Sequence, residues 1–149
     1  MFKTPMRNPS AYTLLELTLV LSLLSLFFIA AMPVTLQILN QQKTKAFVQL
    51  LASDMYLASN AARTRQVETV IDIFPSYSFY ILKIDGKQVR KVEIPKGNKI
   101  KTNYPNQRVT FYGDGQVSRA GTIEIVDTRG KVYQLVVQMS SGRFWIRYV

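Results

Sequence analysis

Two groups of residues in this sequence could do chemistry, and neither forms a conventional enzyme centre. The chain has no cysteine and no histidine, which excludes thiol chemistry, disulfides, zinc sites with Cys or His ligands and Ser-His-Asp triads. Two groups remain. The first is a single carboxylate in an apolar run, Glu16, and the second is the only tryptophan, Trp145, with the arginines Arg143 and Arg147 on either side of it in the sequence. The carboxylate suits charge pairing, and the arginines with the aromatic ring suit phosphate contact and base stacking.

Glu16 is the only charged residue between Arg7 and Lys43. A carboxylate inside a membrane costs on the order of 2.5 kcal/mol or more at the centre and less near the interface. No basic residue lies nearby in the run, so a partner must come from elsewhere, and one candidate is an amine created by proteolysis just upstream. The alternative is that Glu16 lies shallow enough to reach water.

The apolar run predicts a membrane helix. Residues 17–39 carry no charge and as a helix would cross roughly 30 Å of hydrocarbon. Lys3 and Arg7 precede the run, so the positive-inside bias places the N-terminus in the cytoplasm and the rest of the chain outside. A secretory signal peptide has the same general form. Glu16 at the start of the run, and an apolar periodicity that continues past it, favour a retained helix.

The stretch Ala-Tyr-Thr-Leu-Leu-Glu-Leu at residues 11–17 resembles the processing motif of type IV pilins and type II secretion pseudopilins. The resemblance implies cleavage by a prepilin peptidase between Ala11 and Tyr12 and N-methylation of Tyr12. Glu16 then stands at the fifth mature position, and Pro33 falls at mature position 22, where the family often has a helix-kinking proline. Ala11 replaces the usual glycine and keeps the small side chain.

The same resemblance implies a role for Glu16 and a set of partners. In a filament, Glu16 would neutralise the terminal amine of Tyr12 on a neighbouring subunit, and breaking that buried pair would cost roughly 3–5 kcal/mol. The implied partners are other pilin or pseudopilin subunits, the prepilin peptidase and, indirectly, an assembly ATPase and a polytopic platform protein. No cofactor and no metal are expected. The implied location is the cell membrane, single-pass with a cytoplasmic N-terminus, and after assembly a pilus at the cell surface or in the envelope.

A long helix must position these residues. We predict it from about Tyr12 to Arg65, after a leader peptide at residues 1–11. Residues 12–39 are the transmembrane and assembly half, and residues 40–66 are the amphipathic half. In the second half an apolar stripe recurs at three- and four-residue spacing but lacks the sustained heptads of a coiled coil, so we expect it to pack on a sheet. Asp54 interrupts this stripe, whose members are Phe47, Leu50, Leu51, Ala58, Ala61 and Ala62.

The second half of the chain reads as strands and turns. All seven glycines lie between Gly86 and Gly142, and short β-branched runs alternate with turn signals such as Asp85-Gly86. Residues 67–149 therefore predict an extracellular β-sheet domain. The fold class is α+β and pilin-like, with one long N-terminal helix packed on a C-terminal antiparallel β-sheet. Strands are predicted at Val67–Phe74, Tyr77–Ile84, Val89–Ile94, Val109–Tyr112, Thr122–Val126, Val132–Gln138 and Arg143–Tyr148.

The C-terminal part resembles a subgroup of the family. Its Phe-Tyr-Gly-Asp-Gly-Gln-Val at 111–117, Gly-Thr-Ile-Glu-Ile at 121–125 and Gly-Arg at 142–143 are similar to the C-terminal domain of H-type secretion pseudopilins and related minor pilins. With the short leader and lysine-rich body, the chain looks most like the ComGD-type competence pseudopilin of Gram-positive bacteria. That resemblance implies a minor subunit of a competence pilus, needed for DNA uptake in transformation. The alternative is a type II secretion pseudopilin that drives protein export.

The basic residues allow a nucleic-acid site. In a strand, Arg143, Trp145 and Arg147 point to one face. The net charge of +10 favours anionic partners such as DNA, phospholipid head groups or acidic cell-wall polymers, or else it aids solubility and orients the anchor. The three residues either contact DNA or form an ordinary surface with the arginines over the ring. Four other basic residues are interpreted as solvated charges that protect an edge strand, namely Lys96, Lys99, Lys101 and Arg108.

A membrane-tethered enzyme is a third class. The sheet half shows no paired carboxylates and no phosphate-binding loop, and without histidine or cysteine little catalytic chemistry is left. A Ser-Lys arrangement stays open. We therefore expect that the protein is not an enzyme.

Overall fold

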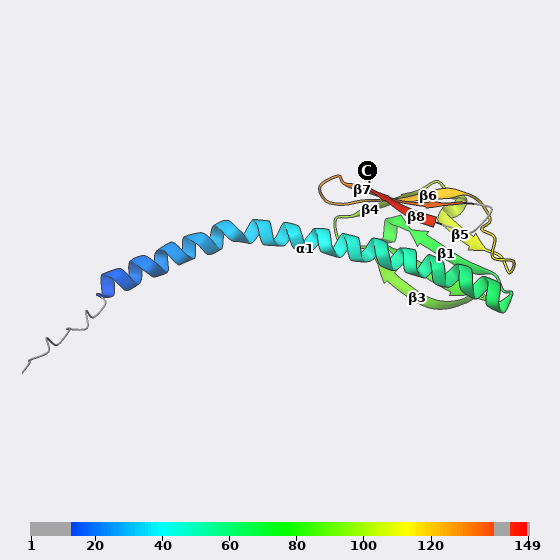
Figure 1. Ribbon diagram of the computed structural model, residues 1–149, viewed down its shortest axis with the longest axis horizontal. Coiled ribbons are helices and arrows are strands. Elements are labelled where there is room, and N and C mark those ends of the chain that lie inside the picture. Colours follow the sequence, from blue (N-terminus) through cyan, green and yellow to red (C-terminus); the bar gives the residue numbers. More distant parts are fainter. Residues whose placement is uncertain (1–12, 139–143, 149) are drawn as a thin grey trace, which may run out of the picture. The chain divides into compact units, whose positions relative to one another are not determined.

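The computed structural model describes residues 13–138 and 144–148. Its contacts divide the chain into two units, residues 1–39 and 40–149. Helix α1 (Leu14–Arg65) supplies the described part of the first unit and the start of the second (Figure 1). The predicted helix is confirmed over the part of residues 12–65 that the structure describes.

The buried stripe of α1 in the second unit follows helical spacing, as predicted. Phe47, Leu51 and Ala58 are buried, and Val48 and Met55 join them. Leu50, which the sequence placed on the same stripe, is 36% exposed. The prediction was wrong for Leu50. Successive residues of an α-helix are rotated by about 100° around its axis, so Leu50 points away from the sheets when its neighbour Leu51 points toward them.

The strands form two sheets, each antiparallel throughout its described pairs. Sheet A has the order β3 (Lys87–Glu93), β2 (Phe79–Ile84), β1 (Thr69–Phe74) and β5 (Arg108–Phe111). Sheet B has the order β4 (Lys99–Thr102), β6 (Gly121–Val126), β7 (Val132–Val137) and β8 (Phe144–Tyr148). Two short 3-10 turns lie between strands, η1 (Pro75–Tyr77) and η2 (Pro105–Gln107).

The α+β, pilin-like class is confirmed, and the predicted sheet is divided into two. Strand β4 was not among the predicted strands, because only Ile100 of its four residues is apolar. That residue is buried, so β4 belongs to the core despite its polar sequence. Every strand that was predicted corresponds to an observed strand.

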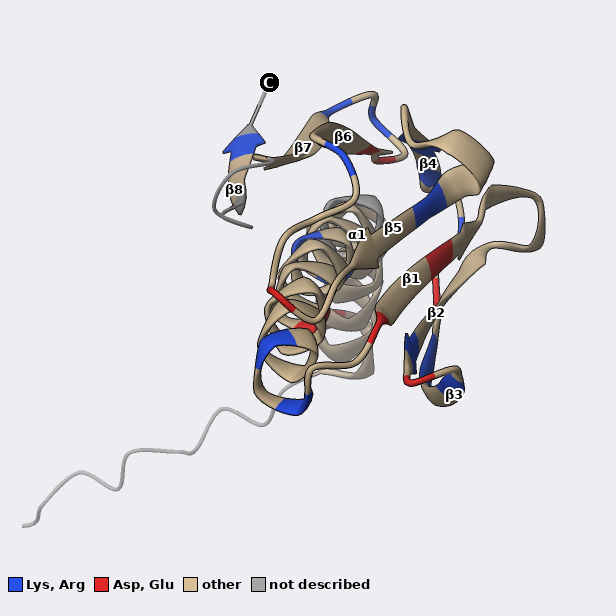
Figure 2. Cartoon of the chain, turned by 90° about the vertical axis from the view of Figure 1, so that its right-hand side faces the viewer, with Lys and Arg blue, Asp and Glu red and all other residues tan. Residues whose placement is uncertain are grey.

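One core joins the helix to both sheets. Figure 2 looks along the second unit and shows α1 end-on, with sheet A beside it and sheet B above it. Met55 of α1, Leu82 of sheet A and Leu135 of sheet B are all fully buried and belong to the same apolar cluster. Removing a side chain of this kind from water contributes about 1.5–3 kcal/mol, so this cluster holds the outer faces of the sheets in fixed positions.

Candidate assembly helix and basic strand

The start of α1 explains the position of Glu16 locally. The backbone N–H of Glu16 donates to Thr13 Oγ1 at 3.3 Å, and that of Leu17 donates to the Thr13 carbonyl at 3.2 Å. Threonine followed three residues later by glutamate is the spacing of a capping box, and a carboxylate is favourable at the positive end of the helix dipole. Glu16 is exposed in the single chain, so its carboxylate is accessible to a neighbouring molecule.

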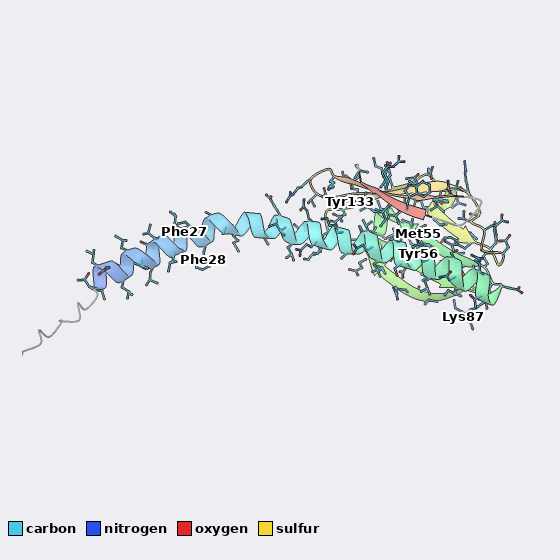
Figure 3. All side chains as sticks on the ribbon, in the orientation of Figure 1. Phe27, Phe28, Met55, Tyr56, Lys87 and Tyr133 are labelled. Atoms are coloured by element: carbon cyan, nitrogen blue, oxygen red, sulfur yellow. The ribbon has the colours of Figure 1, made fainter. Side chains whose placement is uncertain are left out.

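The first half of α1 exposes a long apolar surface. The described residues contain one helix that is long and apolar enough to cross a membrane, and none of its most apolar window is buried. Phe27 and Phe28 are exposed and project away from the helix (Figure 3). Apolar surface of this extent needs lipid or other helices as its surroundings.

The other processing residues are placed only in part. Ala11 and Tyr12 lie outside the described residues, so the cleavage and methylation sites stay predictions. Pro33 lies within α1. The boundaries predicted at residues 11, 39 and 66 likewise stay predictions.

Asp54 attaches the second half of α1 to sheet A. Its side chain is 1% exposed and accepts hydrogen bonds from the Tyr80 hydroxyl at 2.8 Å and from Arg90 Nη1 at 2.6 Å. Burial, together with the hydrogen bond to the Asp54 carboxylate and its charge, raises the pKa of Tyr80 far above its ordinary value. The sequence showed Asp54 only as an interruption of the apolar stripe. A buried charge at that position requires a partner. The partners lie on β2 and β3, so the helical pattern alone could not identify them.

Asp72 of β1 forms a second ionic cluster, on the outer face of sheet A. Its carboxylate contacts Lys83 Nζ at 2.8 Å and Arg108 Nε at 2.5 Å. Burial alone would raise the pKa of Asp72, but the hydrogen bonds and charges of Arg108 and Lys83 outweigh it and hold that pKa below its usual value. Arg108 lies on the edge strand β5 and its side chain is 51% exposed, which agrees with its interpretation as an edge charge, but it is also paired with a carboxylate on the neighbouring strand.

Strand β8 presents the predicted face of Trp145 and Arg147. Both residues are exposed, Trp145 by 40%, whereas Ile146 between them is half-buried and packs on the core. Trp145 lies opposite Val136 of β7, and Arg147 lies opposite Gln134. Arg143 lies outside the described residues, so the structure brings together two of the three predicted contacts.

A groove of about 520 Å³ crosses the outer face of sheet B. One cross-strand row runs along it, from Lys101 of β4 through Glu124 and Gln134 to Arg147 of β8. Gln134 Nε2 donates to Glu124 Oε1 at 2.8 Å. Three interstrand spacings, about 14 Å, separate the backbones of Lys101 and Arg147 at the two edges. Figure 2 shows basic residues on both edge strands.

Sequence reasoning treated Lys101 and Arg147 separately. Their common row depends on the pairing of β4 with β6, and strands so far apart in sequence give no local signal of their pairing. Lys99 and Lys101 lie on β4 at one edge of sheet B, which agrees with their interpretation as edge-strand charges, although no strand was predicted at these residues. The cationic groove itself was not predicted.

Comparisons with known proteins agree with this architecture. Residues 48–142 match the family model of type II transport protein GspH. The type IV minor pilin FimU of Pseudomonas aeruginosa is similar in structure, with a TM-score of 0.60 and 13% identity over 72% of this chain and 90% of that one. The minor pseudopilin EpsH from the type 2 secretion system of Vibrio cholerae has a TM-score of 0.56 and 11% identity over 72% of this chain and 96% of that one. No curated protein matches the sequence significantly.

The structural neighbours establish the fold, and the family model covers more than half of the chain. An exposed apolar helix preceding such a domain is suited to membrane anchoring and to assembly with other subunits. The chain therefore belongs to the family of type II transport protein GspH, and its fold is the pilin-like fold that FimU and EpsH share.

Proposed function

We propose that this subunit is part of a competence pilus, of the ComGD type, and takes part in DNA uptake during transformation. Its role is structural or priming, and not enzymatic. The observation that supports the proposal is the outer face of sheet B, where Trp145 is exposed beside a groove with Lys101 and Arg147 at its edges. Family membership alone fits protein export equally well.

This face has the chemistry of a single-strand contact. Lys101 and Arg147 offer phosphate contacts that depend on salt and not on sequence. Stacking of a base on an aromatic ring contributes about 1–3 kcal/mol, and Trp145 offers such a ring. Glu124 on the groove floor repels phosphate, but Gln134 engages one of its oxygens, and a strand lying across the edges meets the cations first. Arg143, which precedes β8 in the sequence and lies outside the described residues, is proposed as a third contact.

Assembly of the subunit is proposed to follow the pilin route. A prepilin peptidase cleaves between Ala11 and Tyr12, Tyr12 is methylated, and the Glu16 carboxylate pairs with the Tyr12 amine of a neighbour. An assembly ATPase and a polytopic platform protein act indirectly, and the product lies at the cell surface or in the envelope. The exposed position of Glu16 in the first turn of α1 supports this pairing.

The second candidate function is a pseudopilin of a type II secretion system. The match to the family of type II transport protein GspH favours it. In that case the outer face of sheet B would contact another protein and not DNA.

The test is a clean deletion of the gene, with transformation frequency and protein secretion measured in the same strain. We expect DNA uptake to be lost, secretion to be intact, and the wild-type chain to restore uptake. Complementation with Trp145→Ala and Arg147→Ala together should give at least about tenfold less transformation, because stacking and a phosphate contact are removed. Lys87→Ala, which removes one exposed charge on β3, is the matched control and should restore uptake fully.

Two outcomes would contradict the proposal at different points. Normal uptake with impaired secretion in the deletion strain would make this a type II secretion subunit. Full restoration by the double variant would leave the competence role standing but remove the DNA contact from this face of sheet B.

A further inference from the structure

Three segments meet at one end of the second unit. The start of its helical segment, the β3–β4 loop and the β6–β7 turn lie on the same side of this unit in Figure 1. Asn98 Nδ2 of the loop donates to Thr44 Oγ1 of the helix at 2.9 Å. The loop also packs closely on the turn, since a Cβ at Gly97 would lie 2.5 Å from Cγ2 of Thr128. These contacts give this end of the unit a defined surface.

Positive charge gathers at this end. Among the described residues, two carboxylates lie in the same segments, Glu93 and Asp127. Asp127 is 6% exposed, and its Oδ1 accepts the backbone N–H groups of Arg129 at 2.8 Å and Lys131 at 2.9 Å, so it faces inward. The surface is therefore cationic, and the residues that carry the charge are Lys43, Lys96, Lys99, Arg129 and Lys131.

A groove of about 660 Å³ opens between the helix and the β3–β4 loop. Lys43 lines it from the helix and Lys96 from the loop, with Glu93 also among its lining residues. Ala46, Ile94 and Pro95 supply apolar surface to the same groove. Two ammonium groups beside an apolar surface suit a ligand with a phosphate and an adjoining apolar part.

Chain connectivity keeps this groove near the membrane. The uncharged run ends at Leu39, and Lys43 follows four residues later. Four residues span at most about 14 Å even when fully extended, so the limit holds for any placement of the two units. The polar head-group layers account for roughly 10–15 Å of the thickness of a bilayer in total. Lys43 is therefore within reach of head groups whenever residues 17–39 span the bilayer.

We propose that this basic end of the second unit binds the head groups of anionic phospholipids in the membrane that α1 spans, with a phosphate between Lys43 and Lys96. The contact holds the unassembled subunit against the bilayer surface and is released when the subunit enters a filament. Each basic residue near an anionic surface changes the ratio of docked to undocked subunits by a factor of about five. The interaction extends over no more than a Debye length, so salt weakens it.

The test uses the full chain in lipid nanodiscs of phosphatidylcholine, either alone or with a third of the lipid replaced by phosphatidylglycerol. Because the chain has no cysteine of its own, Thr128→Cys gives a single site for a fluorophore at the basic end. Energy transfer to acceptor-labelled head groups then measures docking. Gln88→Cys on β3, next to the β2–β3 turn, serves as a distant reference label. We expect transfer from position 128 to rise with phosphatidylglycerol and transfer from position 88 to stay unchanged or fall.

Charge-neutral variants locate the site. Lys43→Gln with Lys96→Gln should lower the docked-to-undocked ratio about twenty-five-fold in the anionic discs. Lys87→Gln with Arg119→Gln removes the same charge from two other exposed positions and should leave the ratio unchanged. In the unsubstituted chain, about 1 M salt, where the Debye length is near 3 Å, should abolish the lipid dependence.

The proposal is wrong if transfer from position 128 is equal in the two lipid compositions. It is also wrong if the control variant, Lys87→Gln with Arg119→Gln, lowers docking as much as Lys43→Gln with Lys96→Gln does, because the effect would then depend on net charge alone. A third outcome would also overturn the proposal. If Lys43→Gln with Lys96→Gln weakens binding of a DNA oligonucleotide and leaves lipid-dependent energy transfer intact, the basic end is a nucleic-acid surface.

Discussion

At the scale of single residues, Asp54 is the buried charge on which the contact between α1 and sheet A depends. One of its oxygens accepts the Tyr80 hydroxyl and the other accepts Arg90. Tyr80 is fully buried, whereas the Arg90 side chain is 43% exposed. The Arg90 end of the ion pair is partly screened by water and contributes little by itself, so the main cost of losing the carboxylate is a buried hydroxyl without a partner.

Asp54→Ala should lower the free energy of unfolding by roughly 1–3 kcal/mol, the cost of leaving a buried polar group unsatisfied. Arg90→Ala should cost less, about 1 kcal/mol or below, because its side chain is 43% exposed and its charge is partly screened by water. Chemical denaturation of the full chain in detergent micelles measures both. Ser53→Ala, an exposed neighbour on the same helix, is the control, and equal stability of the Ser53 and Asp54 variants would show that the buried pair has no stabilising role.

At the scale of elements, Asp72 joins three adjacent strands of sheet A. It lies on β1 and binds Lys83 of β2 and Arg108 of β5. Its pKa in the folded protein is below the ordinary value, so the carboxylate stabilises the fold when it is ionised. This contribution is fully present above the unfolded pKa, near 4, and is lost as the pH falls through the lower folded value.

Acid should therefore weaken sheet A through Asp72. We expect Asp72→Asn to be less stable than the unsubstituted chain at pH 7, and the difference to shrink as the pH is lowered below about 4. Denaturation curves at pH 7 and at about pH 3 give the two differences. The exposed Asp85→Asn should show a much smaller difference at both pH values. A deficit in Asp72→Asn that stays constant from pH 7 to 3 would mean that its effect is not ionic.

Local sequence patterns were sufficient for most elements, and most of the failures involve residues far apart in the chain. Helical spacing predicted α1, and β-branched runs with turn signals predicted every observed strand except β4, whose single apolar residue is Ile100. The division into two sheets, the pairing of Asp72 with Arg108 and the row from Lys101 to Arg147 all join residues far apart in the chain. Such contacts depend on tertiary packing, which single-sequence periodicity does not record.

At the scale of the whole molecule, the subunit has two kinds of surroundings. The first half of α1 exposes apolar side chains such as Leu26 and Ile29, whereas the second half buries its stripe against two sheets. The first half thus needs lipid or other helices as its surroundings. Glu16 lies in the first turn of that helix, and under the proposed function its carboxylate pairs with the terminal amine of a neighbouring subunit.

Substitutions at Glu16 separate charge pairing from helix capping. Glu16→Ala should leave cleavage between Ala11 and Tyr12 intact but lower filament incorporation by about a hundredfold or more, since a buried charge loses its partner. Glu16→Gln keeps the capping-box spacing with Thr13 while removing the charge, and it should be impaired as well. Immunoblots of sheared filaments and membranes measure incorporation, and intact mass verifies that the chain begins at Tyr12. Normal incorporation of Glu16→Gln would assign the residue to capping instead.

The order of strands along the chain has a consequence for how the domain forms during synthesis. Strand β4 belongs to sheet B but lies between β3 and β5 of sheet A. While the chain is being made, β1 lacks its β5 partner until β4 has already been synthesised, and β4 lacks its own partner until β6 follows. Both strands meanwhile present open edges that can pair with other chains. Strand β6 in turn lacks β7, and β7 lacks β8, so the nascent domain needs shielding until β8 has been added and both sheets are complete.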